Sequence, residues 1–367
     1  MISTSALLGE VWDELERAPI LALDLEMDSY YSYFGKVCLI QLSTPDSDFL
    51  LDPLAGLELA PLGKILADPS KIKVLHAGEN DIPYLRGPLG FETVRSVFDT
   101  YLAARILGYA RCGLAALLEE HFRVQLDKDM QTADWRQRPL SPEQEEYART
   151  DTRYLIQLRE VLLTELRDQG RLEQASSEFD RILDRVHVPR QFDPAGWTRM
   201  RGVRDLNGLG RAILSELYRW RDEEARRRDQ AAFRVLSDRF LCELARRAPT
   251  DPSELPEAHR QELFEAIQRG HKLGFVGFPE PAKSKFVENR LSRTEQEIFD
   301  RLRRWRNETA SLAGVEADQV VPNRLLRQVA RSQPTTMEQL AAVPGFESWR
   351  LEQHGDALLE VLKSPPD

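Results

Sequence analysis

Apolar residues in the first third of the chain fall into short continuous runs, separated by polar turns and by segments with helical spacing. The run Ile20–Leu23 ends at Asp24, which is typical of a buried strand. Helices dominate after Thr100, and Ser141 followed by Pro and Glu is a typical helix start. This order predicts an α/β domain over residues 1–190, with a mixed sheet and helices on both faces. The predicted strands are residues 20–24, 37–42, 49–51, 71–76 and 94–98, and the predicted early helices are residues 57–67 and 81–86.

The second half of the chain is helical and repeats itself. The segment Arg219–Ala225 recurs as Arg304–Ala310, 85 residues later, and other positions recur at the same offset without insertion. These are Val235, Leu241, Ala245, Pro249 and Leu255 in the first copy, and Val320, Leu326, Ala330, Pro334 and Leu340 in the second. A fixed offset predicts a duplicated helical module. We place the copies at residues 207–272 and 290–365, a linker at 191–206 and a connector at 273–289.

Composition narrows the class of protein. Of the 367 residues, 42% are hydrophobic and 30% charged, which excludes a disordered or collagen-like chain. No uncharged apolar run approaches the ~18 residues of a membrane span, and Met1–Glu10 lacks the pattern of a signal peptide. We therefore expect a soluble, cytoplasmic protein that does not bind membranes. The three cysteines, Cys38, Cys112 and Cys242, are far apart in apolar settings, so we expect buried thiols rather than disulfides or a zinc site.

Charge is unevenly distributed along the chain. Residues 1–190 carry 21 Lys+Arg and 32 Asp+Glu, a balance of -11, whereas residues 191–367 carry 29 and 28, a balance of +1. This asymmetry suggests two different tasks for the two halves. A protein that coats nucleic acid without selectivity would be basic overall. The acidic excess of the first half is compatible with carboxylates gathered to hold cations.

Five residues are candidates for chemistry. Asp24 and Glu26 lie two positions apart at the end of a buried strand, so both carboxylates point to the same side. Asp81 follows a strand and a Gly-containing turn at the start of a helix, where it could simply cap that helix. Tyr147 and Asp151 share one helix face and could be an ordinary surface pair. Each signal is weak when it is considered alone.

The order of these signals is more informative than any one of them. Four carboxylates that converge from strand ends and helices can hold two hard divalent cations through oxygen ligands. Two such cations can activate a water and stabilise the leaving oxygen in phosphodiester hydrolysis. A tyrosine, with an ordinary pKa near 10, would stay protonated and orient the attacking water.

Three stretches, Leu21–Ser43, Val74–Leu85 and Phe98–Leu155, resemble the ribonuclease D family of the DEDD exonuclease superfamily, in the subtype with Tyr in its last motif. The resemblance covers roughly residues 10–190. It implies a ribonuclease H-like fold and 3′→5′ exonuclease activity. It also implies four metal-binding acids and a water-positioning tyrosine, which are Asp24, Glu26, Asp81, Asp151 and Tyr147. One departure is Leu25, where the family often has Thr between the first two acids.

Six further positions in these stretches are candidates for contact with the substrate: Met27, His76, Asn80, Lys128, Trp135 and Arg138. Lys128 and Arg138 could neutralise phosphates. Trp135 could stack on a base or anchor the core. His76 and Asn80 flank the second acidic motif and could touch the terminal nucleotide, although a lone histidine is more often structural.

The helical repeat resembles the HRDC domain, which in many bacterial members of the ribonuclease D family follows the nuclease in two copies. The resemblance implies two all-α bundles that assist nucleic-acid binding. The runs Arg226–Arg228 and Arg246–Arg247 could contact phosphates or form solvated helix faces. Trp220 and Trp305 lie in apolar helical frames and are expected in the core.

The function expected from these observations is a metal-dependent 3′→5′ exoribonuclease that trims structured RNA such as tRNA precursors. It would use two divalent cations, Mg²⁺ or Mn²⁺, and no small-molecule cofactor, and it would release nucleoside 5′-monophosphates. A 3′→5′ DNA exonuclease of the Werner type is an alternative, because no residue distinguishes ribose from deoxyribose. A non-catalytic nucleic-acid-binding scaffold is the third interpretation.

Overall fold

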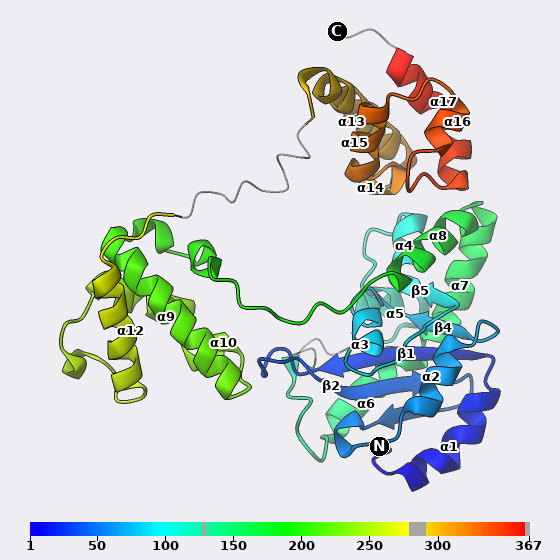
Figure 1. The fold of residues 1–367 in the computed structure, drawn as a ribbon. Helices are drawn as coiled ribbons and strands as arrows, with labels where there is room; N and C mark the ends of the chain where they lie inside the picture. The colour runs from blue at the N-terminus through cyan, green and yellow to red at the C-terminus, as the bar shows by residue number, and fades with distance from the viewer. Residues whose placement is uncertain (127–129, 131, 279–290, 364–367) are drawn as a thin grey trace.

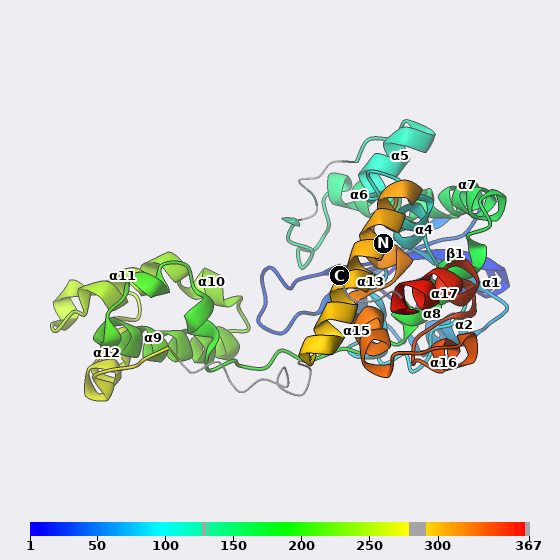
Figure 2. The same cartoon turned by 90° about the horizontal axis from the view of Figure 1, so that it is seen from above.

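The computed structural model describes residues 1–126, 130, 132–278 and 291–363, and it shows three bodies in series along the chain (Figure 1). Each body has its own hydrophobic cluster, drawn from residues 8–182, 197–267 and 298–359. The first contains a sheet flanked by helices, and the other two are helical (Figures 1 and 2). The predicted fold class is confirmed. Among the described residues, no helix combines the length and the apolar character that a membrane crossing requires.

The sheet of the first body has five strands in the order β3-β2-β1-β4-β5. Strand β1 pairs antiparallel with β2 and parallel with β4, so the sheet is mixed, as predicted. All seven residues of β2 are buried, because both faces of this strand are covered. The strands are β1 (Ile20–Met27), β2 (Val37–Ser43), β3 (Asp48–Leu51), β4 (Ile72–Leu75) and β5 (Val97–Asp99).

Eight α-helices surround this sheet among the described residues of the first body. The helix expected after Ser141 is present, and Ser141 forms a capping box with Gln144 that fixes its first turn. This helix, α6, packs on β1, β2 and β3, and the following helix, α7, packs on β1 and β4. The helices are α1 (Ser5–Arg17), α2 (Ala60–Ala67), α3 (Ile82–Arg86), α4 (Thr100–Leu107), α5 (Leu114–Phe122), α6 (Pro142–Arg153), α7 (Leu155–Asp168) and α8 (Leu172–Leu183).

The two helical modules share one plan, a long first helix followed by a short helix and a medium one. The first module contains α9 (Gly208–Arg227), α10 (Ala232–Val235), α11 (Asp238–Arg247) and α12 (Arg260–Leu273). The second contains α13 (Arg293–Ala313), α14 (Ala317–Val320), α15 (Asn323–Ser332), α16 (Met337–Ala341) and α17 (Ser348–Lys363). The first residues of α9, α10 and α11 each lie 85 positions before the first residues of α13, α14 and α15, which is the offset found in the sequence.

A buried arginine shows the repeat in atomic detail. The Nη1 atom of Arg221 donates to the carbonyl oxygen of Leu236 at 2.9 Å and to Asp238 Oδ1 at 2.7 Å. In the second module the same bonds are made by Arg306, Val321 and Asn323. In each module this guanidinium ties the long helix to the start of the medium helix. The duplication therefore extends to buried polar contacts.

The expected linker, residues 191–206, is only partly a linker. From Gly196 onward it contains two 3₁₀ turns, Gly196–Arg199 and Val203–Asp205. Trp197, Val203 and Leu206 are buried in the cluster of the first helical module, so these residues belong to that module's core. Most of the expected connector, residues 279–289, lies outside the described residues. Cys38 and Cys242 are buried free thiols, but Cys112 is partly exposed, unlike the prediction.

Candidate active site

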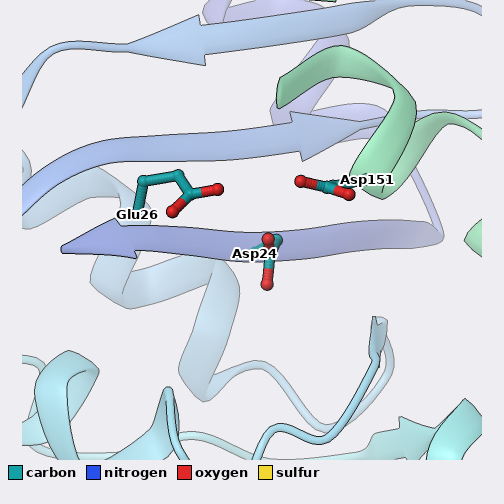
Figure 3. A group of neighbouring side chains, drawn as sticks. All are labelled: Asp24, Glu26 and Asp151. Atoms are coloured by element: carbon teal, nitrogen blue, oxygen red, sulfur yellow. The ribbon is translucent and has the colours of Figure 1, made fainter. Parts of the chain in front are cut away.

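Two acids of the site come from β1. Asp24 and Glu26 pair with Gln41 and Leu39 of β2, and a register shift follows directly after Glu26. Because side chains alternate along a strand, both carboxylates lie on one face of the sheet. Asp151 of α6 points to the same place (Figure 3), and one carboxylate oxygen from each of these residues lies within 4.8 Å of the others.

Helix α6 is anchored next to its acidic residue. Thr152 is fully buried, and its hydroxyl lies 2.7 Å from the hydroxyl of Ser43 on β2. Arg153 donates through Nε to Asp48 of β3 at 2.6 Å. These two contacts hold Asp151, the residue before Thr152, over β1. Tyr147, one turn before Asp151 on the same helix, lines the same cavity as its carboxylate.

The fourth acid, Asp81, approaches from the loop after β4. It occupies the position before α3, yet its side chain makes no capping hydrogen bond there, which removes the capping explanation. Asp81 is only 6% exposed, and its charge contributes to raising the pKa of Glu26. Asp81 thus faces the group formed by Asp24, Glu26 and Asp151, although it is not part of that tight triplet.

Asp99, a residue that the sequence analysis missed, holds this loop in place. Asp99 is fully buried and accepts hydrogen bonds from the backbone N–H groups of Gly78 at 2.7 Å and Leu102 at 2.9 Å. It therefore connects the loop that presents Asp81 to the first turn of α4. Its position directly before a helical segment was a capping signal in the sequence, but only the fold shows that it also binds the loop.

The acids of the site raise one another's pKa values. Burial raises the pKa of Asp24 to about 7, and burial together with the charge of Asp24 raises the pKa of Asp151 to about 9. Burial and the charges of Asp24, Asp151 and Asp81 hold the pKa of Glu26 well above its usual range. Buried carboxylates in this arrangement cost free energy unless a cation accompanies them. Their all-oxygen donor set suits a hard divalent cation, so the residues present fit the predicted metal.

Asp24, Glu26 and Asp151 line a cavity of about 600 Å³, together with Tyr147, His76 and Tyr101. Leu114 and Leu126 add an apolar wall. Burial and the charge of Asp151 raise the pKa of Tyr147, so its phenol keeps its proton. The cavity thus combines a cation-binding floor with an uncharged hydroxyl and an apolar surface.

His76 is the predicted substrate-contacting residue that lies in this cavity. Its Nδ1 atom is 2.9 Å from the hydroxyl of Thr100, and burial lowers its pKa to about 4, so the ring is neutral near pH 7. Met27 is half-buried at the end of β1, and Asn80 is exposed on the loop that leads to Asp81. Lys128 lies outside the described residues.

The structure does not bring Trp135 or Arg138 into the cavity, which corrects their predicted contacts with bases and phosphates. Trp135 is 1% exposed and packs in a small core cluster with Cys38 and Leu39, so neither face of its ring is available. The guanidinium of Arg138 donates to both carboxylate oxygens of Asp52, at 2.6 and 2.8 Å. Both side chains stabilise the first body, which contains the sheet.

The chain is similar to known 3′-5′ exonucleases and, among these, to ribonuclease D. Residues 1–167 match the family model described as a 3′-5′ exonuclease, and residues 210–261 and 295–362 match the HRDC domain. Ribonuclease D of Zymomonas mobilis is 34% identical over 291 residues, covering 74% of this chain and 73% of that protein. The chain belongs to the ribonuclease D family, as the motifs predicted.

Other relatives are longer proteins. The exosome complex exonuclease RRP6 of Saccharomyces cerevisiae is 33% identical over 265 residues, which cover 68% of this chain and 36% of RRP6. The chain thus spans about a third of the length of the exosome proteins that it matches. Among solved structures, Escherichia coli RNase D is 26% identical with a TM-score of 0.63, covering 100% of this chain and 99% of that chain.

Proposed function

We propose that this protein is a divalent-metal-dependent 3′→5′ exoribonuclease that hydrolyses phosphodiester bonds and releases nucleoside 5′-monophosphates. The observation that carries the proposal is the triplet of Asp24, Glu26 and Asp151, whose carboxylate oxygens lie within 4.8 Å of one another, with Tyr147 beside it in one cavity. Membership of the ribonuclease D family supports the same activity. E. coli RNase D is described as an exoribonuclease involved in structured RNA processing, which favours structured RNA, such as tRNA precursors, as the substrate here.

Asp24, Glu26, Asp81 and Asp151 would hold two divalent cations, Mg²⁺ or Mn²⁺. Bound cations of this kind lower the pKa of a water and stabilise the charge that develops on the leaving oxygen. The carboxylates themselves supply the negative charge and the oxygen donors.

Tyr147 would position the attacking water. Its raised pKa makes the phenol a poor base, so it orients the water through a hydrogen bond rather than removing a proton. Tyr147 and Asp151 lie one helical turn apart on α6 and line the same cavity, so the phenol is held beside the acids. This arrangement agrees with the role implied by the family resemblance.

His76 would accept a hydrogen bond from a hydroxyl group of the terminal ribose. Its Nδ1 side is occupied by Thr100, which leaves Nε2 for a ligand in the cavity. A neutral imidazole with a protonated Nδ1 presents a hydrogen-bond acceptor at Nε2. This contact would favour RNA over DNA if the donor is the 2′-hydroxyl.

The test is degradation of a 5′-labelled RNA with an unpaired 3′ tail, beside the DNA of the same sequence. Reactions contain Mg²⁺, Mn²⁺ or EDTA, and Asp151→Asn is the control variant. We expect a metal-dependent ladder that shortens from the 3′ end of RNA and is absent with the variant. Preference for DNA would support the Werner-type alternative. Binding without cleavage of either substrate would leave the scaffold interpretation.

A further inference from the structure

The loop between β1 and β2 carries four aromatic residues within five positions, Tyr30, Tyr31, Tyr33 and Phe34. None of these four aromatic residues belongs to the acid triplet or lines its cavity. We call the first body, which contains the sheet and the acid triplet, the nuclease body. In Figure 1 this loop extends from the nuclease body toward α10 of the first helical module. The loop and that module are in direct contact, because the backbone N–H of Ala231 donates to the carbonyl oxygen of Tyr31 at 2.8 Å.

Side-chain bonds hold the loop and the module together. Asp229, just after α9, accepts from the backbone N–H of Phe34 at 3.0 Å and from the ammonium group of Lys36 at 2.6 Å. Asp222 of α9 accepts from the phenol of Tyr33 at 2.7 Å. The carboxylates of Asp222 and Asp229 therefore already accept hydrogen bonds from the loop. The side chains of α10 lie next to the same loop.

The two parts together form a surface of exposed rings. Tyr30 is 50% exposed, Phe34 is 44% exposed and Phe233 of α10 is 47% exposed. The rings of Tyr30 and Phe233 are in contact, with centroids 5.1 Å apart. Contiguous exposed apolar side chains, unlike scattered ones, are typical of interaction sites.

Arginines stack on these rings. The guanidinium carbon of Arg234 is 4.1 Å from the centroid of Tyr31 and 5.1 Å from that of Tyr30, and that of Arg226 is 5.9 Å from Phe34. Both arginines are exposed. Within the part of the chain that the structure describes, neither arginine has a carboxylate within salt-bridge distance, and Arg234 donates through Nε to the carbonyl oxygen of Tyr30 at 3.1 Å. We call Tyr30, Phe34, Phe233, Arg226 and Arg234 the aromatic–arginine surface.

The surface begins close to the catalytic acids. Tyr30 lies four residues after Glu26. Even in a fully extended chain, the Cα atoms of these two residues are therefore at most about 14 Å apart. A strand of nucleic acid whose 3′ end occupies the cavity could therefore reach the surface with its next nucleotides. Aromatic rings that stack on bases, combined with arginines that neutralise phosphates, are the features by which proteins bind single strands without reading the sequence.

We propose that the aromatic–arginine surface binds the unpaired RNA strand on the 5′ side of the scissile bond. The bases stack on Tyr30, Phe34 and Phe233, and the phosphates lie against Arg226 and Arg234. The first helical module supplies three of these five side chains, so it takes part directly in substrate binding. The proposal rests on the proposed function and adds to it the route of the substrate strand.

The experiment compares two substrates under the same conditions with Mg²⁺. One is an RNA with a long unpaired 3′ tail, which can cover the surface, and the other is an RNA dinucleotide, which is too short to occupy both the cavity and the surface. Phe233→Ala and Tyr30→Ala should each raise KM for the long RNA about tenfold, because each removes one stacking ring. The kcat for the long RNA and the kcat/KM for the dinucleotide should stay at the wild-type values.

Matched variants control for general effects. Leu312→Ala removes an apolar side chain that is 92% exposed on the second helical module, and it should change neither substrate's parameters. Arg226→Gln should lower the salt dependence of KM for the long RNA by about 0.7 in the log–log slope. Arg227→Gln should not, because Arg227 already pairs with Glu224. Thermal unfolding of each variant checks that it is folded.

Unchanged KM for the long RNA in Phe233→Ala and Tyr30→Ala would overturn the proposal. An equal loss on the dinucleotide would also overturn it, because the side chains would then act on the catalytic site rather than on the strand. Wild-type activity on both substrates tests the proposed function separately. Absence of that activity would refute the nuclease assignment, whereas active wild-type enzyme with unaffected variants refutes only the surface.

Discussion

The Nδ1 atom of His76 lies 2.9 Å from the hydroxyl oxygen of Thr100, and that hydroxyl donates to the carbonyl oxygen of Leu75 at 3.0 Å. A threonine hydroxyl has one hydrogen, and a carbonyl can only accept. The hydrogen of Thr100 is therefore used by Leu75, and His76 must donate through Nδ1. Because burial lowers the pKa of His76 to about 4, the ring is neutral near pH 7 and Nε2 carries a lone pair.

This relationship predicts how the enzyme senses the end of RNA. His76→Ala should lower kcat/KM for an all-RNA substrate by about tenfold or more, because a hydroxyl of the terminal ribose loses its acceptor. The measurement uses the same RNA ending in a 2′-deoxy or a 3′-deoxy nucleotide. The substrate that lacks the hydroxyl in question should be cleaved equally by wild type and variant.

Thr100→Val is the matched positioning variant. It keeps the shape of the side chain and removes the acceptor that fixes the tautomer of His76, so it should reduce the same discrimination while leaving the imidazole in place. If both variants lost activity equally on all three RNA ends, His76 would be a structural residue.

Tyr147→Phe isolates the phenol of Tyr147. The ring remains, but the hydrogen bond that would orient the attacking water is lost, and kcat should fall about 10²-fold. Stabilisation of the protein by Mg²⁺ should persist, because the four carboxylates are intact. Asp151→Asn should reduce both. A kcat close to that of wild type in Tyr147→Phe would show that the water is positioned by other groups.

Much of the site was predictable because its residues lie in ordered segments with strong local signals. Alternation along a buried strand placed Asp24 and Glu26 on one face, and the helix that starts at Ser141 placed Tyr147 and Asp151 one turn apart. Local pattern does not record which elements meet in space. Asp99 was therefore missed, since its partner Gly78 lies 21 residues earlier in the chain.

The aromatic–arginine surface could not be predicted for the same reason. Tyr30 and Phe233 are about two hundred residues apart, and only the docking of the first helical module on the β1–β2 loop brings them together. Trp135 illustrates the opposite case. Its sequence neighbourhood suited either a base-stacking residue or a core anchor, and packing against Leu39 of β2 and Leu50 of β3, far earlier in the chain, places it in the core.

Trp135→Ala should therefore act on stability rather than on substrate binding. Removing a buried tryptophan that is 1% exposed should lower the free energy of unfolding by about 3–5 kcal/mol. Denaturant unfolding of wild type, Trp135→Ala and Trp135→Phe measures this cost, and Trp135→Phe should recover part of it. A selective rise in KM for RNA, with unchanged stability, would restore the base-stacking role.

The raised pKa values of the acids predict how stability depends on pH and metal. In the folded, metal-free protein the pKa of Asp24 is raised to about 7 and that of Asp151 to about 9, whereas aspartates in an unfolded chain titrate near about 3.9. The folded state then binds more protons than the unfolded state between these values. Because stability falls with rising pH wherever the folded state holds the extra protons, the metal-free nuclease body should become less stable from about pH 4 to about pH 9.

Divalent cations reverse this loss, because they require ionised carboxylates and bind with release of protons. The stabilisation by Mg²⁺ should therefore grow as pH rises, and at neutral pH it should reach about 2.7 kcal/mol when Mg²⁺ is at a hundredfold excess over its Kd. Thermal unfolding in EDTA and in Mg²⁺, at a series of pH values, measures both trends. Asp151→Asn should be more stable than wild type in EDTA at high pH and should gain little from Mg²⁺. A Mg²⁺ effect that is independent of pH, or equal in wild type and variant, would mean that these carboxylates do not hold the cation.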